Sequence, residues 1–378
     1  MSDGAPWAVT FLVNSLRVGG AEKHTIQLFN ALDPARFRKS LIYLKPEEQL
    51  LADVVPGRGT TWCADFNKGW DYAGLRRLSG WLQDVRPDVL VCVNTYPLFY
   101  GYLARALAGV RCRILEIFHS TRLPTADYRK MRWVYRRFFN RCDRVVYVSE
   151  AQRAHWERDG IHKDLGVVIH NGIDAQRFRD RCGTEDKAAL RARFGFATDD
   201  FVVGICAALR PEKQHEDLIA AIAQLRAQGV AAKCLIIGDG PRRAAIERNV
   251  IDRSLQSDIA ITGFQSDVRP FIAACDAMAL VSPRIETFSI AALESMALGK
   301  PIVMSAVGGA AEQVREGVNG YLFPAEDVDA LAGALRKLTE PVHRAQLGGN
   351  ARAIVEREFA AQVMLDRYAG ILAAEARR

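Results

Sequence analysis

Two series of alternating strand-like and helix-like segments constrain the fold of this chain more than any other feature. In the first half, β-rich apolar runs such as "AVTFLVN", "DVLVCVN" and "DRVVYVS" alternate with amphipathic stretches such as "AEKHTIQLFNAL". The alternation breaks around "IHNGIDAQRF", where Asn171 and Gly172 favour a turn, and it starts again with "DFVVGICAAL". Strands that alternate with helices are typical of a mostly parallel, doubly wound sheet. The sequence therefore predicts two α/β domains joined near residues 175–185.

The length and composition of the chain agree with this organisation. Its 378 residues are enough for two domains of ordinary size, and 49% hydrophobic with 25% charged residues is normal for a soluble globular protein. No apolar run approaches the roughly 18 residues that can cross a bilayer. The N-terminal "WAVTFLVNSL" lacks the basic start of a signal peptide, so we expect it to be a buried first strand.

Cysteine usage and net charge narrow the class of protein. None of the eight cysteines forms a CxxC pair, and several lie in strand-like runs such as "VLVCVN". This indicates reduced, structural thiols in a reducing compartment. The net charge of +7 suits an anionic ligand or an anionic membrane surface without requiring nucleic acid. We therefore expect a cytoplasmic protein with no nucleic-acid partner.

Two loops that follow strand-like runs could hold phosphate. In "VGGAEKH", Gly19 and Gly20 would let a backbone approach a phosphate closely at the start of a helix, with a plain tight turn as the alternative. In "LRPEKQ", Arg210 and Lys213 lie near a helix start, where the helix dipole disfavours cations, so a nearby anion would explain the pair. Two solvated charges are the alternative. Neither half contains GxGxxG ("GDGPRR" stops one glycine short), which disfavours a dehydrogenase.

The stretch "RIETFSIAALESMALGKP" (284–301) places two carboxylates around an apolar helix. The spacing predicts a helix that begins near Ser289, capped by Thr287 or by Ser289 itself, and such an N-terminus is an anion site. Glu286 lies in the preceding loop and Glu294 in the second turn, so the two carboxylates could line one ligand lengthwise rather than share a proton. An ordinary exposed helix is the alternative.

The order of these motifs resembles one protein family. "GGAEKH", "HS" at 119–120, "HNGID", "LRPEKQ", "ETFSIAALESMALGKPIV" and "VGGAAE" together resemble the GT4 family of retaining glycosyltransferases, which have the GT-B fold, over nearly the whole chain. The resemblance implies an α/β protein of two Rossmann-like, doubly wound domains that face each other across a cleft. It implies an acceptor-binding domain at 1–175, to which a C-terminal helix at 358–378 returns, and a donor-binding domain at 176–357.

The resemblance also implies roles for individual residues. In the C-terminal domain, Glu294 would hold the ribose hydroxyls of a nucleotide sugar and Glu286 the hydroxyls of the donor sugar. In the N-terminal domain, His119 would lie near the sugar and the reacting bond, whereas we expect His24 to be structural. The other expected donor contacts are Gly19, Gly20, Arg210 and Lys213 at the diphosphate, Thr287 and the backbone amides of Phe288 and Ser289 at the helix start, and Phe264 at the base.

The reaction implied by the resemblance is a retaining hexosyl transfer from a UDP- or GDP-sugar to a glycan or lipid-linked acceptor, in bacterial-type polysaccharide or glycolipid biosynthesis. Two cations and a helix N-terminus would stabilise the charge that grows on the leaving diphosphate, so we expect neither a metal nor another cofactor. The only DxD, from Asp327 to Asp329, reads as a helix start. The alternatives are a nucleotide-sugar-binding subunit without turnover and a UDP-sugar epimerase.

The segment "YRKMRWVYRRFFNRCDR" (128–144) holds seven Lys or Arg residues with aromatic residues between them. A basic amphipathic helix of this kind can lie on an anionic membrane. In that case we expect the protein to be peripheral on the inner face of the cytoplasmic membrane, with a lipid-linked acceptor. In the alternative, Val134, Phe138 and Cys142 pack inward and the arginines are only solvated.

Overall fold

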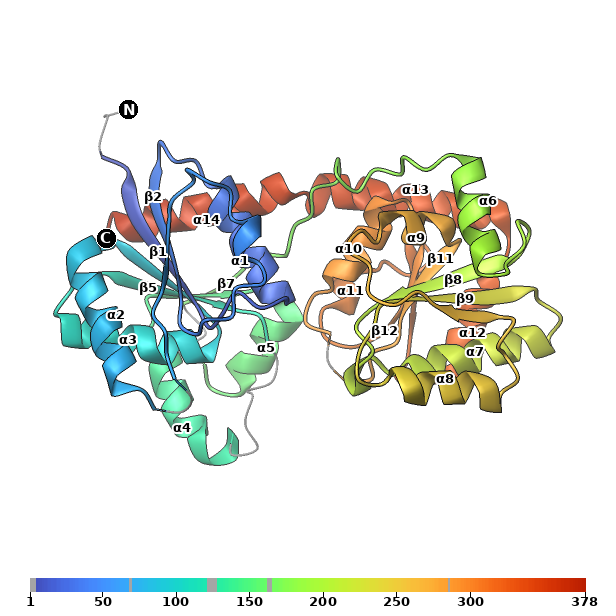
Figure 1. Cartoon of the computed structure of the whole chain (residues 1–378), viewed down its shortest axis with the longest axis horizontal. Helices are drawn as coiled ribbons and strands as arrows, with labels where there is room; N and C mark the ends of the chain where they lie inside the picture. The colour runs from blue at the N-terminus through green and yellow to red at the C-terminus, as the bar shows by residue number, and fades with distance from the viewer. Residues whose placement is uncertain (1–4, 68–69, 121–127, 162–164, 285) are drawn as a thin grey trace. The chain divides into compact units, whose positions relative to one another are not determined.

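The computed structural model divides the chain into two compact units, each built around its own sheet (Figure 1). It describes residues 5–67, 70–120, 128–161, 165–284 and 286–378, and between 128 and 135 it describes the side chains of Trp133 and Val134 only. Unit 1 extends to Asn171 and includes Val363–Arg378, and unit 2 is Gly172–Gln362. Among the helices within the described residues, none is long and apolar enough to span a bilayer.

The sheet of unit 1 has seven strands, all parallel, in the order β3-β2-β1-β4-β5-β6-β7. Its strands are β1 (Trp7–Val13), β2 (Phe37–Tyr43), β3 (Thr60–Cys63), β4 (Val89–Val93), β5 (Arg113–Phe118), β6 (Arg144–Tyr147) and β7 (Gly166–Val168). Each lies in a strand-like run of the sequence. The run is clearest for the central strand β4 (VLVCV), because a parallel strand buried on both faces is apolar along its whole length. The strand order reverses between β1 and β4, and ligands of such sheets bind at the carboxyl ends of strands near this point.

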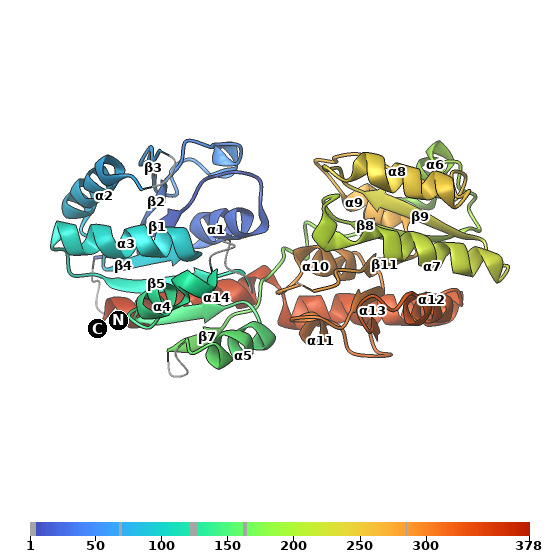
Figure 2. The same ribbon diagram turned by 90° about the horizontal axis from the view of Figure 1, so that it is seen from below.

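Helices cover both faces of this sheet. They are α1 (Gly20–Ala31), α2 (Tyr72–Val85), α3 (Thr95–Ala108), α4 (Tyr128–Phe139), α5 (Glu150–Arg158) and α14 (Ala361–Ala376), with a 3-10 turn η1 (Leu51–Asp53). Apolar side chains of α1 and α14 form one core with β1, β4 and β5, and those of α2 and α3 form a second core on the opposite face. Figure 2 shows α2 and α3 on one side of the sheet and α14 on the other.

The sheet of unit 2 has six parallel strands in the order β10-β9-β8-β11-β12-β13. They are β8 (Phe201–Cys206), β9 (Ala232–Ile237), β10 (Ile259–Ile261), β11 (Ala277–Leu280), β12 (Ile302–Ser305) and β13 (Gly320–Phe323). The sequence pattern did not predict β13, an edge strand of sequence GYLF that lies directly between the turn-favouring residues Asn319 and Pro324. The sheet is therefore one strand wider than expected.

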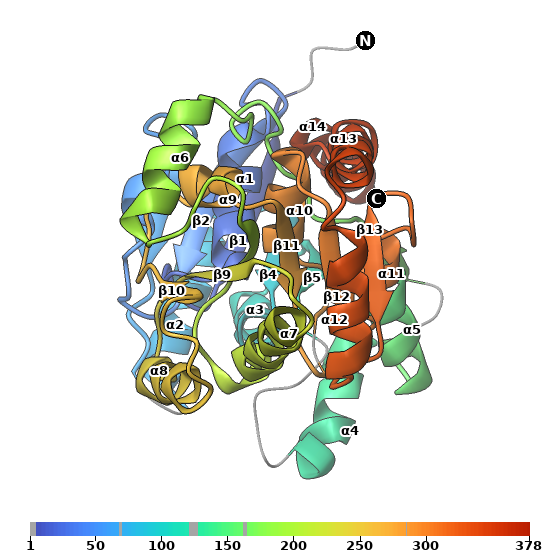
Figure 3. The same cartoon turned by 90° about the vertical axis from the view of Figure 1, so that its right-hand side faces the viewer.

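Helices also flank this second sheet on both faces, with α7 and α12 on one side and α9 and α10 on the other (Figure 3). The helices are α6 (Thr184–Arg193), α7 (His215–Ala227), α8 (Arg243–Asp252), α9 (Arg269–Ala274), α10 (Ile290–Ala297), α11 (Ala310–Gln313), α12 (Val328–Lys337) and α13 (Pro341–Glu358), with a 3-10 turn η2 (Pro211–Lys213).

The C-terminal helical stretch ends in unit 1, to which Val363–Arg378 belongs. It consists of two helices, because the chain leaves helical geometry at Phe359 and pairs with Ile173 on both sides of Ala360. After this break, α14 inserts Met364, Tyr368 and Leu372 into the core beside β1. The chain passes from unit 1 to unit 2 at 171/172 and back to unit 1 at 362/363. The domain bounds expected from the resemblance are 175/176 and 357/358.

Candidate active site

A lysine, a serine and a glutamate meet at the carboxyl ends of the central strands of unit 2. Lys213 ends η2 after β8, and Ser282 and Glu286 follow β11, the strand next to β8. Lys213 Nζ donates to Glu286 Oε2 at 2.7 Å, and Ser282 Oγ donates to the same oxygen at 3.0 Å. The Glu286 side chain is 11% exposed and that of Lys213 is 26% exposed. The structure therefore brings two of the expected site residues into contact, and it adds Ser282, which the sequence reading missed.

The loop after β12 fixes the backbone of Glu286. The Gly309 N–H donates to the Glu286 carbonyl at 3.1 Å. Gly308 has a φ of +55°, and a Cβ on it would lie 2.0 Å from the same carbonyl oxygen. Only glycine meets both requirements at position 308, since it tolerates a positive φ and has no Cβ. The "VGG" turn therefore holds the loop that carries Glu286.

The start of α10 is held from within unit 2. Of the two predicted caps, Thr287 and Ser289, the N-cap is Ser289, and its hydroxyl accepts from the Ala292 N–H at 3.2 Å. The buried Gln313 accepts from the Ser289 N–H at 2.9 Å and donates to the Ser289 carbonyl at 2.8 Å. The Ser289 amide is therefore already engaged, and the expected contact between this amide and a phosphate would require the bond to Gln313 to be replaced. The Phe288 ring is buried and packs edge-on against Phe359, with ring centroids 5.4 Å apart.

The remaining expected residues of unit 2 lie on loops or at half-buried helix positions. Arg210 lies just before η2, is largely exposed and forms a loose ion pair with Glu212 at 3.9 Å. Phe264 follows β10 and is 73% exposed, which is unusual for a phenylalanine. Thr287 and Glu294 are half-buried, the latter in the second turn of α10.

The expected residues of unit 1 lie at the start of α1 and at the end of β5. Gly19 is the N-cap of α1 and Gly20 its first residue. His119 follows β5, and its N–H donates to Asn94 Oδ1 at 3.1 Å. Burial lowers the pKa of His119 well below its usual range, and the neighbouring His24 lowers it further. His119 is therefore a neutral imidazole at pH 7.

His24 contacts His119, which the sequence did not predict. Their rings meet edge-on with centroids 4.8 Å apart. The Tyr368 ring of α14 also meets the His24 ring edge-on, with centroids 5.5 Å apart. The side chain of His24 is buried, and burial lowers its pKa to about 4. A signal for Asn94 and His119 exists in the sequence, because each is the polar residue that directly ends an apolar run ("VCVN", "EIFH").

The DxD of the chain starts a helix, as predicted. Asp327 is the N-cap of α12 and accepts from the Ala330 N–H at 2.9 Å, while Asp329 accepts from Gln224 at 2.7 Å. Within the part of the chain that the structure describes, no group of three His, Cys, Asp or Glu side chains is arranged to hold a metal ion. All eight cysteines are free thiols.

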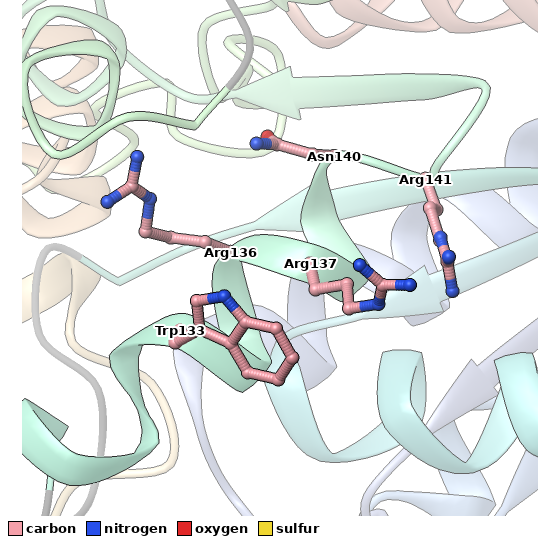
Figure 4. Close-up of a pocket in the computed structure, with 5 residues that line it drawn as sticks. All are labelled: Trp133, Arg136, Arg137, Asn140 and Arg141. Atoms are coloured by element: carbon pink, nitrogen blue, oxygen red, sulfur yellow. The ribbon is translucent and has the colours of Figure 1, made fainter.

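Part of the basic segment 128–144 forms an exposed surface on α4 and the turn after it. Trp133, Arg136, Arg137, Asn140 and Arg141 line a shallow pocket, and the Arg137 guanidinium lies 5.6 Å from the Trp133 ring centroid (Figure 4). Trp133 is 70% exposed. Cys142 is buried and Phe138 packs against Phe99 and Tyr102, so their predicted inward packing is confirmed, and Val134 is half-buried. The Arg132 side chain lies outside the described residues.

Two family descriptions match most of the chain. Residues 18–177 match "Glycosyltransferase Family 4" and residues 186–354 match "Glycosyl transferases group 1". The chain belongs to the group 1 glycosyltransferases. The family resemblance of its motifs is thereby confirmed.

Individual relatives of this glycosyltransferase carry names with different sugars and acceptors. It is 28% identical to the N-acetyl-alpha-D-glucosaminyl L-malate synthase of Bacillus anthracis over 273 aligned residues. These residues make up 71% of this chain and 69% of the relative. It is 31% identical to a GDP-mannose-dependent monoacylated alpha-(1-6)-phosphatidylinositol monomannoside mannosyltransferase of Corynebacterium glutamicum. The 250 aligned residues make up 64% of this chain and 65% of that relative.

Solved structures agree with the GT-B fold of this glycosyltransferase. Anabaena Alr3699/HepE, determined in complex with UDP, is 25% identical and has a TM-score of 0.84 over 97% of this chain and 100% of that one. The lipopolysaccharide outer core galactosyltransferase WaaB, at 18% identity and a TM-score of 0.74 over 97% and 99% of the two chains, shares the fold. The two parallel sheets of the chain are thus the two Rossmann-like domains of a GT-B protein.

Proposed function

We propose that this glycosyltransferase moves a hexose from a nucleoside diphosphate sugar to a glycan or lipid-linked acceptor, with retention of configuration and without a metal. The observation that carries the proposal is the contact of Lys213 and Ser282 with the Glu286 carboxylate at the carboxyl ends of β8 and β11. The complexes of Anabaena Alr3699/HepE with UDP and with UDP-glucose support a nucleoside diphosphate donor.

The donor roles follow from the chemistry of each side chain. Glu286 has a second carboxylate oxygen beyond the one that Lys213 and Ser282 occupy, and this oxygen can accept from hydroxyls of the donor sugar. Lys213, together with the exposed Arg210, supplies positive charge for the diphosphate. Glu294 would accept from the ribose hydroxyls, and the exposed ring of Phe264 would pack on the base.

In unit 1, the proposed donor and sugar contacts come from the backbone and from one imidazole. Gly19 and Gly20 would approach the diphosphate at the N-terminus of α1, where the helix N–H groups point outward. His119, as a neutral imidazole, can exchange hydrogen bonds with a sugar hydroxyl without adding charge.

In the proposed reaction, the bond between the anomeric carbon and the phosphate oxygen breaks first. The acceptor oxygen forms its bond on the same face, and its proton passes to an oxygen of the leaving diphosphate. Negative charge grows on that diphosphate, where Arg210 and Lys213 stabilise it in the role that a metal has in other enzymes. Asp327 and Asp329 accept hydrogen bonds at the start of α12, which supports the structural reading of this DxD.

Thermal unfolding with a panel of UDP- and GDP-sugars tests the donor first. A donor at 100 times its Kd should add about 2.7 kcal/mol of stability. Transfer assays with and without EDTA, and NMR of the anomeric centre of the product, then test metal use and stereochemistry. Loss of activity in EDTA that Mn²⁺ restores, inversion, or a trapped glycosyl-enzyme adduct would each overturn the corresponding part of the proposal. Donor binding without transfer or hydrolysis would favour a binding subunit, and epimerised donor would favour an epimerase.

We also propose that the exposed surface of Trp133, Arg136, Arg137 and Arg141 contacts an anionic membrane, which would favour a lipid-linked acceptor. Two aromatic residues of α4 differ in burial: Phe139 is buried in the unit 1 core, whereas Trp133 is exposed next to the arginines. An exposed tryptophan beside arginines fits the interface between lipid headgroups and acyl chains.

Binding to anionic vesicles tests this contact. The wild type should bind vesicles of acidic phospholipid, and binding should weaken with salt. Arg136→Glu with Arg137→Glu should abolish most of this binding. Arg248→Glu with Arg253→Glu, which makes the same charge change on exposed positions of unit 2, is the matched control. Equal loss of binding in both double variants would indicate net charge alone and contradict the proposal.

A further inference from the structure

The turn from β4 into α3 has a backbone conformation that an asparagine rarely adopts. Asn94 joins the two elements with φ +67° and ψ 171°, a region occupied almost only by glycine. Such strain persists only where the surrounding contacts impose it, and it is concentrated at functional sites. Asn94 is half-buried and lies one residue beyond β4, next to β5 in the sheet.

The hydrogen bonds of Asn94 show why an asparagine stands there. In a parallel ladder, the N–H of a residue donates to the carbonyl of one residue on the neighbouring strand. Its own carbonyl accepts from the N–H of the residue two positions further along that strand. Asn94 N–H donates to the Ile117 carbonyl at 3.0 Å, so the ladder continues past the end of β4. Its carbonyl would next accept from His119, but it instead accepts from Leu98 N–H at 3.2 Å and starts α3.

The side chain of Asn94 accepts the hydrogen bond that its backbone carbonyl would accept in a continuing ladder. Asn94 Oδ1 accepts from the His119 N–H at 3.1 Å, which is the bond that the backbone carbonyl would make in a continuing ladder. The same residue therefore starts α3 with its carbonyl and extends the hydrogen bonding of β5 by one residue with its side chain. The His119 backbone is held in line with β5, and its ring is held from the other direction by its edge-on contact with His24.

We propose that Asn94 is a positioning residue for His119, and this inference rests on the proposed function of His119 at the donor sugar. Glycine would adopt the backbone conformation without strain but has no acceptor, and aspartate offers an acceptor oxygen of the same reach. Asparagine supplies the acceptor and carries no charge beside the imidazole. A displacement of about 1 Å at a reacting group can cost on the order of 100-fold in rate.

Asn94→Gly separates positioning from folding. Relief of backbone strain offsets the lost hydrogen bond, so the thermal midpoint should stay near that of the wild type. Turnover in sugar transfer should fall by about 10- to 100-fold, while the KM and Kd for the donor nucleotide stay within about twofold. Asn94→Asp should retain most of the turnover. Arg86→Gly, which relieves a positive φ of 44° at the exposed end of α2, is the matched control and should behave as the wild type.

Hydrogen exchange of the His119 amide provides a readout that does not depend on activity. The wild type and Asn94→Asp should protect this amide, and Asn94→Gly should expose it to exchange. If the wild type transfers no sugar from any donor, the proposed function fails, whereas the exchange result still tests the bond.

Two results would overturn the proposal. One is wild-type turnover in Asn94→Gly despite loss of amide protection, and the other is unchanged protection in that variant. If Asn94→Gly does not fold, Asn94→Asp decides, and loss of either turnover or amide protection in this variant contradicts the role.

Discussion

At the residue scale, the two glutamates of unit 2 differ in what surrounds them. Glu286 precedes α10 in a loop that Gly308 and Gly309 hold, and its carboxylate contacts a lysine and a serine. Glu294 lies about two turns further along, within α10. Two carboxylates so placed are suited to hold different parts of one elongated ligand rather than to share a proton.

Substitution of the two glutamates should therefore affect different kinetic constants. Glu294→Ala should weaken donor binding by about 10- to 100-fold with a smaller effect on turnover, because a hydrogen bond to a charged group contributes about 1.5–3 kcal/mol. Glu286→Ala should mainly lower turnover, because positive charge develops on the donor sugar in the transition state, where Glu286 is expected to bind. Donor titration and steady-state kinetics measure both, with the exposed Glu185→Ala as control. Wild-type constants in both variants would mean that the stretch is an ordinary helix.

His24 should make the stability of the protein depend on pH. Its pKa in the folded state is about 4, against 6.5 for an ordinary histidine, because burial disfavours the charged form. Between these values the unfolded chain binds the proton and the folded chain does not. The free energy of unfolding should therefore fall as pH decreases from 6.5 to 4, at up to about 1.4 kcal/mol per pH unit for this residue.

Urea unfolding at several pH values measures this dependence. His24→Phe should have a shallower decrease between pH 6.5 and 4 than the wild type, since it removes one buried imidazole. The exposed His155→Phe is the matched control and should keep the wild-type slope. Equal slopes in all three proteins would show that His24 is protonated in the folded state.

At the element scale, α10 depends on a contact from α11. The helix has only eight residues, so its own backbone hydrogen bonds contribute little to its stability. Gln313 of α11 is fully buried, and its side-chain amide forms both an accepted and a donated bond with the N-cap residue Ser289. The helix start that carries the expected donor residues is thus fixed by a residue 24 positions later in the chain.

Gln313→Ala should reduce the free energy of unfolding by about 1–3 kcal/mol, because the buried Ser289 N–H loses its partner, whereas the Ser289 carbonyl keeps the bond from the Leu293 N–H. Urea denaturation measures the change as a lower midpoint. The exposed Gln228→Ala, whose side chain accepts from Arg336, should change it by less than about 0.5 kcal/mol. A midpoint equal to the wild type in Gln313→Ala would contradict this role of the buried amide.

At the scale of the whole molecule, the C-terminal helix completes the core of the first unit. Met364, Tyr368 and Leu372 lie among side chains of β1, α1 and β4, more than 270 residues earlier in the chain. Arg144 at the start of β6 donates to Glu375 with Nε at 3.0 Å and Nη2 at 2.8 Å, and this carboxylate is almost fully buried. Unit 1 therefore cannot form its complete core until the end of the chain is present.

Leu372→Ala should destabilise unit 1 selectively. Truncation of a fully buried leucine costs about 2–5 kcal/mol, through lost burial and the cavity that remains. Hydrogen exchange should become faster in β1 and β4 and stay unchanged in β8 and β11. Val363→Ala on the same helix, where the side chain is 39% exposed, is the matched control. Equal protection loss in both sheets would contradict the assignment of α14 to unit 1.

The sequence alone was enough to predict the two α/β domains and most of their strands, because apolar runs of fixed spacing are a local property of a buried parallel sheet. It also determined the family, through motifs that each lie within one short segment. The N-cap roles of Ser289 and Asp327 were readable for the same reason, since capping involves neighbours three residues apart.

The contacts between distant side chains became visible only in the folded structure. The contacts of Lys213 with Glu286, of Asn94 with His119 and of Gln313 with Ser289 join residues that are 73, 25 and 24 positions apart. No local spacing encodes such contacts, because they depend on the order in which strands pair in a sheet. The contact of His24 with His119 escaped the sequence reading for the same physical reason, whereas the edge strand β13 escaped it because turn-favouring residues flank it.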